Sequence, residues 1–152
     1  MTKLKLSDLA SIAEILASVV VIASLAYIGL ELRQNTQAMQ QASYQSANDY
    51  LLQLDLAQAT NEELNRLVMK AESTPADVTE EEWERFTKMA YSRYGLWEFI
   101  VLADQEDAIN SSQLLVFEPY FVETACDPGY VQFWGDHNVG FSPVFQQYIE
   151  KK

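Results

Sequence analysis

The hydrophobic positions of this chain form one continuous run near its start and spaced stripes further along. The run is Ile15–Leu30, sixteen residues that read ILASVVVIASLAYIGL, with no charge inside and with Glu14 and Glu31 on either side. A helix over Leu9–Leu32 is about 36 Å long at about 1.5 Å per residue, and the hydrocarbon layer of a bilayer is about 30 Å thick. The run therefore predicts a transmembrane helix over Leu9–Leu32.

Two other interpretations of the run stay open. A cleaved signal peptide suits the basic residues Lys3 and Lys5, although no small-x-small cleavage pattern follows the run. A buried core helix suits its length, because sixteen uncharged residues fall short of the ~20 of a usual span. Tyr27 lies near one end of the run, as aromatic residues do at a membrane interface, and this favours the transmembrane interpretation.

The faces of the predicted membrane helix differ. At about 100° per residue, small residues share one side, and we name them the small-residue stripe: Ala10, Ala13, Ala17 and Ser24. Glu14 and Ser18 lie on the adjoining side. Small residues let membrane helices approach closely, whereas a carboxylate at membrane depth faces protein or water. The stripe predicts a helix–helix interface with Glu14 inside it, and the alternative is that Glu14 lies at the headgroup level without a special role.

The chain that follows the run contains no helix breaker before Pro75, since 31–74 holds neither Gly nor Pro. Its part 34–48 is also uncharged and rich in Gln, Asn and Ser. The membrane segment 1–32 is therefore expected to continue as a helical stalk over 33–60. Such a stalk serves either as a helix–helix seam or as a solvated spacer.

Spaced apolar positions predict a separate helical domain over 61–152. A short helix is expected over 61–72, and Pro75 ends it. Thr79 and Glu82 have the spacing of a capping box and open a helix that reaches about Ala103. Apolar residues recur along it at three- and four-residue steps and predict its core face: Trp83, Phe86, Ala90, Tyr94, Trp97, Ile100 and Val101.

Three shorter helices complete the predicted domain. Ser111 or Ser112 caps a helix over 112–125, which Pro119 is expected to kink or split. Asp127 and Pro128 suit the cap and first position of a helix that ends near Trp134.

A loop over Gly135–Gly140 is expected next, and Ser142 and Pro143 then open a last helix over Val144–Glu150. No alternating strand pattern of useful length occurs. The predicted fold class is all-α, with a long N-terminal transmembrane helix that continues into a stalk, followed by a small helical bundle.

Three segments carry a resemblance to a known group of proteins. They are SLAYIGLELRQNTQAMQQASYQ (24–45), the helix around Trp97, and DPGYVQFWGDHNVGFSPVFQQYIEK (127–151). Together they resemble a widespread group of uncharacterised small bacterial membrane proteins. The resemblance implies one helix in the bacterial inner (plasma) membrane and a helical domain behind it, and it implies no activity.

The chain departs from that group in two places. The group usually carries several Arg after the membrane helix, which would place its domain in the cytoplasm, but here only Arg33 remains. Pro119 also interrupts a helix expected to be continuous. Lys3 and Lys5 before the helix, against Arg33 after it, weakly favour a cytoplasmic N-terminus. The side of the domain is therefore undecided, with a slight preference for the cytoplasm from the resemblance.

Charge narrows the possible partners. The chain has a formal net charge of −12, and residues 1–30 contribute none of it because Lys3 and Lys5 balance Asp8 and Glu14. An acidic domain repels phosphates, so we expect no nucleic-acid partner. The lipid bilayer is the expected partner of the apolar run, and attachment to it must be hydrophobic.

Candidate chemistry is sparse. Cys126 and His137 are the single residues of their kinds, so neither a disulfide within the chain nor a common structural zinc site is expected. Cys126 and His137 can act as a nucleophile and its base only if the fold brings them together. The acidic residues that open the helix at Glu80 suit its N-terminus better than a metal, and Asp104–Asp107 lack the spacing of a calcium loop. We expect no metal and no cofactor.

The sequence therefore predicts a membrane-anchored helical protein that acts by self-assembly, as a homo-oligomer packed along the small-residue stripe, or by binding a protein partner. An oligomeric pore with Glu14 and Ser18 facing its interior is the alternative. A membrane-bound hydrolase that uses Cys126 and His137 is a second alternative. Whether the protein is an enzyme stays uncertain, with a preference for no.

Overall fold

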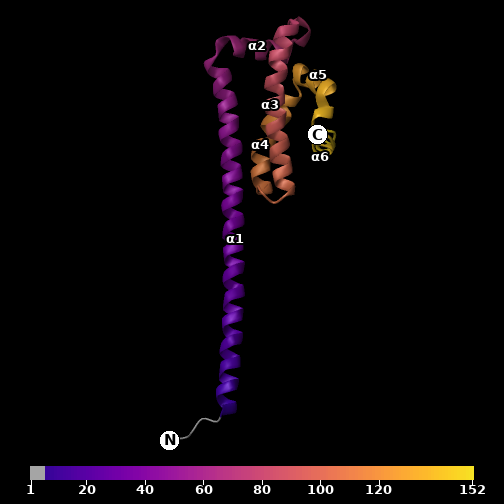
Figure 1. Ribbon diagram of the computed structural model, residues 1–152. Helices are drawn as coiled ribbons and strands as arrows, with labels where there is room; N and C mark the ends of the chain where they lie inside the picture. The colour runs from indigo at the N-terminus through magenta and orange to yellow at the C-terminus, as the bar shows by residue number, and fades with distance from the viewer. Residues whose placement is uncertain (1–5) are drawn as a thin grey trace. The chain divides into compact units, whose positions relative to one another are not determined.

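The fold is helical throughout the part of the chain that the computed structural model describes, residues 6–152, and no strand occurs in that part (Figure 1). This confirms the all-α class and the long N-terminal helix followed by a small bundle. The helices are α1 (Leu6–Thr60), α2 (Glu62–Ser73), α3 (Glu80–Gln105), α4 (Ser111–Ala125), α5 (Pro128–His137) and α6 (Pro143–Ile149), with the 3₁₀ turns η1 (Pro75–Asp77) and η2 (Asn138–Gly140).

The chain divides into two compact units, Met1–Ala38 and Met39–Lys152, and α1 contributes to both. The second unit begins at Met39, so it includes most of the segment 33–60 that was expected as a helical stalk. Small and polar residues made it look like a spacer, but Ala47 is buried and the Tyr44 ring lies 5.4 Å from that of Phe117. This part of α1 forms a helix–helix seam, one of the two roles that its composition left open.

The first unit presents its apolar residues outward. Within residues 6–152, α1 is the one helix long and apolar enough to cross a membrane, and none of its apolar window is buried by the rest of the chain. Ile15, Ile22 and Leu25 are each about two-thirds exposed. The interpretation of the run as a core helix of this chain is therefore wrong.

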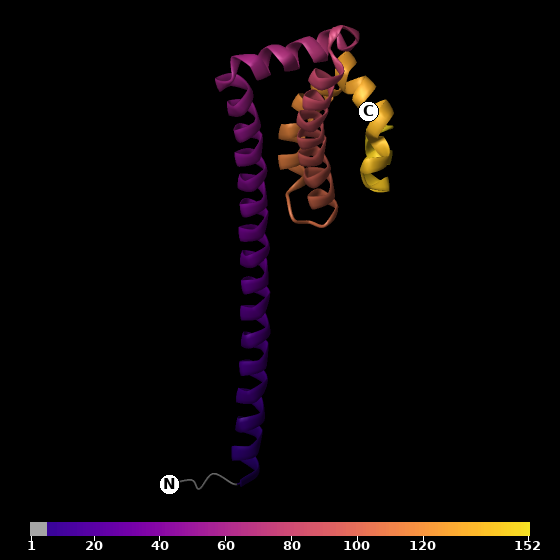
Figure 2. The same cartoon turned by 45° about the horizontal axis from the view of Figure 1, so that its top comes forward.

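The second unit is organised around the aromatic face of α3. Of the seven predicted core positions, Trp83 is half-buried and the other six are buried. The Trp97 ring stacks on Phe121 of α4 at 5.3 Å and meets Phe145 of α6 edge-on at 5.6 Å. α2 runs from the end of α1 to the start of α3 (Figure 2) and packs against α3 and α5. Aromatic pairs of this kind stabilise the domain beyond the effect of the apolar area that the helices bury.

The helix ends follow the capping residues closely. The hydroxyl of Thr79 accepts a bond from the Glu82 N–H, and the Glu82 carboxylate accepts one from the Thr79 N–H, which confirms the capping box. The cap of α4 was predicted one or two residues too late: Asn110, not Ser111 or Ser112, accepts the Ser112 N–H at 2.9 Å. Asn is among the strongest N-cap residues, so it begins the helix earlier than either serine.

Two further boundaries differ from the prediction. Pro119 does not split α4, which is continuous over Ser111–Ala125. The carbonyl that loses its partner belongs to Leu115, an exposed residue, so water can replace the missing bond.

The predicted loop over Gly135–Gly140 is also wrong. α5 continues to His137, whose ring lies 5.3 Å from that of Tyr91 on α3. η2 then forms from Asn138 to Gly140. Packing against α3 holds helical a segment that its glycines alone would not favour.

Gly129 gives a test of how α5 packs on α2. A Cβ at this position would lie 2.2 Å from the carbonyl oxygen of Ala71 and 2.8 Å from its carbonyl carbon. Gly129→Ala must therefore push two helices apart, and we expect it to lower the free energy of unfolding by about 1–3 kcal/mol or more. The measurement is chemical unfolding of the full chain followed by Trp fluorescence.

Gly135→Ala is the matched control on the same helix. A Cβ there meets no atom within 4 Å, so this change is expected to leave stability unchanged or raise it by up to about 1 kcal/mol. Equal effects of the two substitutions would contradict the close approach of α5 to α2.

Candidate functional site

The small-residue stripe lies exposed on α1, as do Glu14 and Ser18. The hydroxyls of Ser18 and Ser24 form hydrogen bonds within α1: Ser18 Oγ donates to the Glu14 carbonyl and Ser24 Oγ to the Val20 carbonyl, both at 2.8 Å. Each hydroxyl oxygen can still accept a bond from another chain. The stripe is accessible to a second helix, and its alanines would permit close packing there.

Cys126 and His137 are not brought together. Cys126 is exposed at the end of α4, and His137 is the last residue of α5. α5 separates them by about 15 Å at about 1.5 Å per residue, whereas a nucleophile and its base need hydrogen-bond distance. The His137 ring lies 5.0 Å from that of Phe133. His137 therefore packs against the aromatic core of the domain.

The acidic start of α3 has a structural role. Glu82 completes the capping box and also accepts a bond from Lys70 Nζ at 3.0 Å. Within residues 6–152 no group of three His, Cys, Asp or Glu is placed to hold a metal ion. These carboxylates stabilise the helix start and join it to α2.

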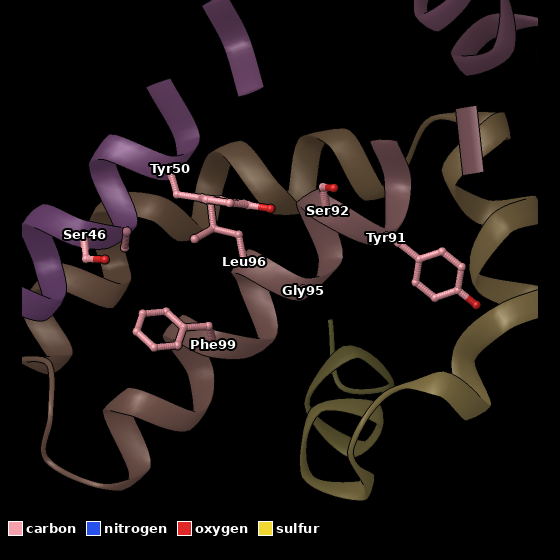
Figure 3. A pocket seen from close by; sticks show the side chains of 8 residues that line it. Ser46, Tyr50, Tyr91, Ser92, Gly95, Leu96 and Phe99 are labelled. Carbon is pink, nitrogen blue, oxygen red and sulfur yellow. The ribbon is translucent and has the colours of Figure 1, made fainter. Parts of the chain in front are cut away.

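A groove between α1 and α3 is a candidate binding site, and we name it the α1–α3 groove (Figure 3). It lies within the unit Met39–Lys152 and has a volume of about 470 Å³. Small-molecule sites in proteins commonly occupy 300–1,000 Å³, roughly. Its lining residues are Ser46, Ala47 and Tyr50 of α1 and Tyr91, Ser92, Gly95, Leu96 and Phe99 of α3.

The groove combines a small, buried floor with aromatic edges. Ala47 and Leu96 are buried, and a Cβ added at Gly95 would meet no atom within 4 Å. Tyr50 and Phe99 remain 44% and 45% exposed beside this open space. In Figure 3 the Tyr50 side chain points from α1 toward α3. The space above Gly95 is therefore open to an apolar group from outside.

Tyr91 borders the groove but is anchored elsewhere. Its ring meets Phe133 edge-on at 4.9 Å and stacks on Phe141 at 5.8 Å. Figure 3 shows it pointing away from α1. Tyr91 therefore fixes one end of the groove to the rigid aromatic core.

No charged side chain lines the groove. The neighbouring charges of α3 are directed to other contacts: Glu98 accepts the Ser142 N–H at 2.6 Å, and Arg93 is buried on another side of the helix. Polar groups in the groove are hydroxyls, those of Ser46, Ser92 and Tyr50. The groove can therefore bind an uncharged, apolar surface and offer a few hydrogen bonds.

Arg93 is the polar centre of the domain, and it is only 7% exposed. It donates from Nη2 to Gln58 Oε1 at 2.6 Å and from Nη1 to Glu72 Oε1 at 3.3 Å. Its guanidinium carbon lies 5.8 Å from the centre of the Tyr130 ring and 6.0 Å from that of Tyr120. A single side chain thus joins five helices, α1 to α5. Removing one partner of such a buried pair leaves an uncompensated charge.

Neither the buried Arg93 cluster nor the α1–α3 groove was predicted from the sequence, for different reasons. Arg93 follows Ala90 by three residues and precedes Trp97 by four, so it occupies a core position of the predicted stripe. A charge at such a position signals a buried pair, and that signal was available. No such signal exists for the α1–α3 groove, because its two walls are forty or more residues apart along the chain.

A second cavity, of about 410 Å³, lies next to Arg93. Asp55, Glu72 and Glu123 contribute carboxylates to its lining. Asp55 Oδ1 accepts the Tyr120 hydroxyl at 3.3 Å and lies 3.9 Å from Arg93 Nη2. Most of the polar groups around this cavity thus bond to one another and hold α1 to α4.

Comparisons with protein-family models, with curated proteins and with solved structures returned no match to this chain.

Glu72 makes the stability of the Arg93 cluster depend on pH. Burial raises the pKa of the Glu72 carboxyl above its ordinary value of 4.5, and the charge of Arg93 offsets only part of that shift. The folded state therefore favours protonated Glu72, which stabilises the fold below the unfolded pKa and loses this contribution as pH rises through the folded pKa. Glu72→Gln removes this titration.

We therefore expect the free energy of unfolding of Glu72→Gln, minus that of the wild type, to grow between about pH 4 and pH 7. Chemical unfolding at a series of pH values measures it, and the subtraction cancels the other carboxylates. A difference that shrinks over this range would show that attraction to Arg93 outweighs the burial of Glu72.

Proposed function

We propose that this is a single-pass membrane protein that acts by assembling with copies of itself or with another protein. The observation that supports the anchor is the exposure of α1 over Leu9–Leu32. Its large apolar side chains lie about half to two-thirds exposed, among them Val20 at 63% and Leu30 at 61%. Apolar patches of this extent mark a protein or membrane contact.

A bilayer is the cover that fits this surface best. Apolar side chains surround the helix on all faces between Ile15 and Leu30, with no charge among them. A protein partner would need to enclose the entire circumference, whereas lipid does so without further structure. The resemblance to small bacterial membrane proteins supports the bacterial inner membrane, and it gives a slight preference for the cytoplasmic side for the helical domain, which the charges around the helix leave undecided.

Self-association through the small-residue stripe is the specific form of assembly that we propose. On the side of the helix that the stripe occupies, Ala13 and Ala17 present small side chains. The bulky Ile15, Val19 and Ile22 lie on other sides. Helices in lipid associate by close packing of this kind. The distance between Cys126 and His137 favours binding over hydrolysis by that pair.

Cysteine cross-linking in native membranes tests both parts of the proposal. Cys126→Ser removes the single native cysteine, and single cysteines are then placed at Ala13, Ala17, Val19 or Ile22. Membranes are washed at alkaline pH first, and the protein is expected to remain in them. Cysteines at Ala13 and Ala17 are expected to form dimers, because the stripe brings their Cβ atoms within disulfide reach.

Cysteines at Val19 and Ile22 are the matched controls, because they share the membrane depth of the stripe but not its face. They are expected to remain largely monomeric. Equal cross-linking on every face would reject the stripe as the interface, and release of the protein by the alkaline wash would reject the membrane anchor.

A further inference from the structure

The part of α1 that belongs to the helical domain contributes little to the buried core. Among residues 9–152, Ala47 is the one residue of α1 that is buried. Tyr44 and Leu51 are only partly buried against the core. The apolar area that α1 buries in the domain is therefore small. Its contribution to stability is small as well, because the hydrophobic effect scales with the buried area.

Two cavities adjoin the same stretch of α1. The α1–α3 groove lies against residues 46–50 of this helix, and the second cavity lies against residues 55–59. Atoms beside a cavity lose the van der Waals contacts that a packed neighbour would give, and well-packed interiors contain few such spaces. The seam between α1 and the other helices is therefore the loosely packed part of this domain.

Helices α2 to α6, which we name the α2–α6 bundle, have a core of their own. The rings of Phe86 on α3 and Tyr130 on α5 lie 5.1 Å apart, and both residues are 0% exposed. The Trp97 ring packs on Phe121 of α4 and on Phe145 of α6. None of these five rings belongs to α1. The bundle can therefore stay folded when α1 leaves it.

The polar contacts of α1 lie at the two ends of the seam, one of them close to a hinge. Gln40 Nε2 donates to the Asp107 carbonyl at 3.0 Å, and Arg93 Nη2 donates to Gln58 Oε1 at 2.6 Å. Asn61 alone separates α1 from α2, at the place where the chain turns (Figure 2). A few residues at the end of an element can absorb a change in backbone angles. Rotation at Asn61 would break both contacts without melting either helix.

Arg93 does not prevent such a movement. When Gln58 leaves, Glu72 of α2 still accepts a bond from Arg93 Nη1, at 3.3 Å. The second cavity is lined by Arg93 itself, so water reaches the guanidinium as α1 moves away. The charge therefore keeps a partner and gains solvent, which avoids the cost of an unpaired buried charge.

We propose that residues 39–60 of α1 detach from the α2–α6 bundle as one helix, by rotation at Asn61, while the bundle stays folded. The domain thus has a docked and a released state on its long helix. Release exposes Tyr44 and Ala47 on α1 and Phe117 on the bundle, so the two states present different surfaces to a partner. The inference goes beyond the proposed function, and it does not depend on the bilayer because it concerns only the seam.

Thiol labelling of buried cysteines in the full chain measures this opening. Ala47→Cys places a thiol at the seam, and Ala90→Cys is the matched variant in the bundle core, where Ala90 is 0% exposed. Both are made in the Cys126→Ser chain, reconstituted in vesicles and treated with N-ethylmaleimide. Each rate is divided by that of the same chain unfolded in urea. We expect the thiol at position 47 to react faster by about 100-fold or more, because local opening costs less than global unfolding.

Gly129→Ala separates opening of the seam from unfolding of the whole domain. Its Cβ would lie 2.2 Å from the Ala71 carbonyl oxygen, so it weakens the packing of α5 on α2, which the docked and released states share. We expect it to speed the labelling of Ala90→Cys by about ten-fold or more. The labelling of Ala47→Cys is expected to stay unchanged.

Gln58→Met tests the contact beside the hinge. It removes the acceptor of Arg93 at a similar side-chain length, so we expect it to speed the labelling of Ala47→Cys by about ten-fold. Ala90→Cys is expected to gain the same factor, since global unfolding breaks the same bond. Gln53→Met is the matched control at an exposed position of α1, and it is expected to change neither rate.

Three results would overturn the inference. Equal rates for Ala47→Cys and Ala90→Cys would show that α1 leaves only when the whole domain unfolds. Acceleration of both rates by Gly129→Ala would show the same. A rate for Ala47→Cys that Gln58→Met leaves unchanged would mean that the reagent reaches this thiol without breaking the contact between α1 and Arg93.

Discussion

The apolar surface of α1 needs a cover that the rest of the chain does not supply. Between Ile12 and Leu30, ten Ile, Leu and Val side chains are about half exposed or more. Burying such side chains is worth roughly 1.5–3 kcal/mol each when complete, so the total is of order 10 kcal/mol. That is comparable to the whole stability of a typical domain. The bilayer that we propose around this segment would supply the missing cover, and the rest of the account depends on that proposal.

The helical domain is organised around one long helix, α3, which packs against several neighbours. α3 directs its aromatic face to α4, α5 and α6, and Trp97 alone contacts Phe121 and Phe145. Its Arg93 gathers polar groups from the surrounding helices in one buried place. One side of α3 carries Ser92, Gly95 and Phe99 beside α1, and no charged side chain lies among them. The α1–α3 groove lies on this side of the helix.

Local patterns gave most of the elements. The capping residues Thr79 and Ser142 and the apolar stripe of α3 predicted helices within one or two residues of their bounds. Errors arose where tertiary contacts decided the outcome. His137 stays helical because it packs on Tyr91. The role of the polar part of α1, which the sequence left open between a seam and a spacer, also depends on distant contacts, since Ala47 is buried and Tyr44 packs on Phe117. The groove depends on the same distant pairing, so no local pattern could predict it.

The depth profile of α1 tests the central claim most directly. Spin labels are attached to single cysteines from Ile12 to Tyr50 in the Cys126→Ser chain, reconstituted in vesicles, and exposed to oxygen and to a water-soluble nickel complex. We expect collisions with oxygen to dominate across Ile15–Leu30 and collisions with nickel to dominate beyond Arg33. Nickel access throughout Ile15–Leu30 would contradict the membrane anchor.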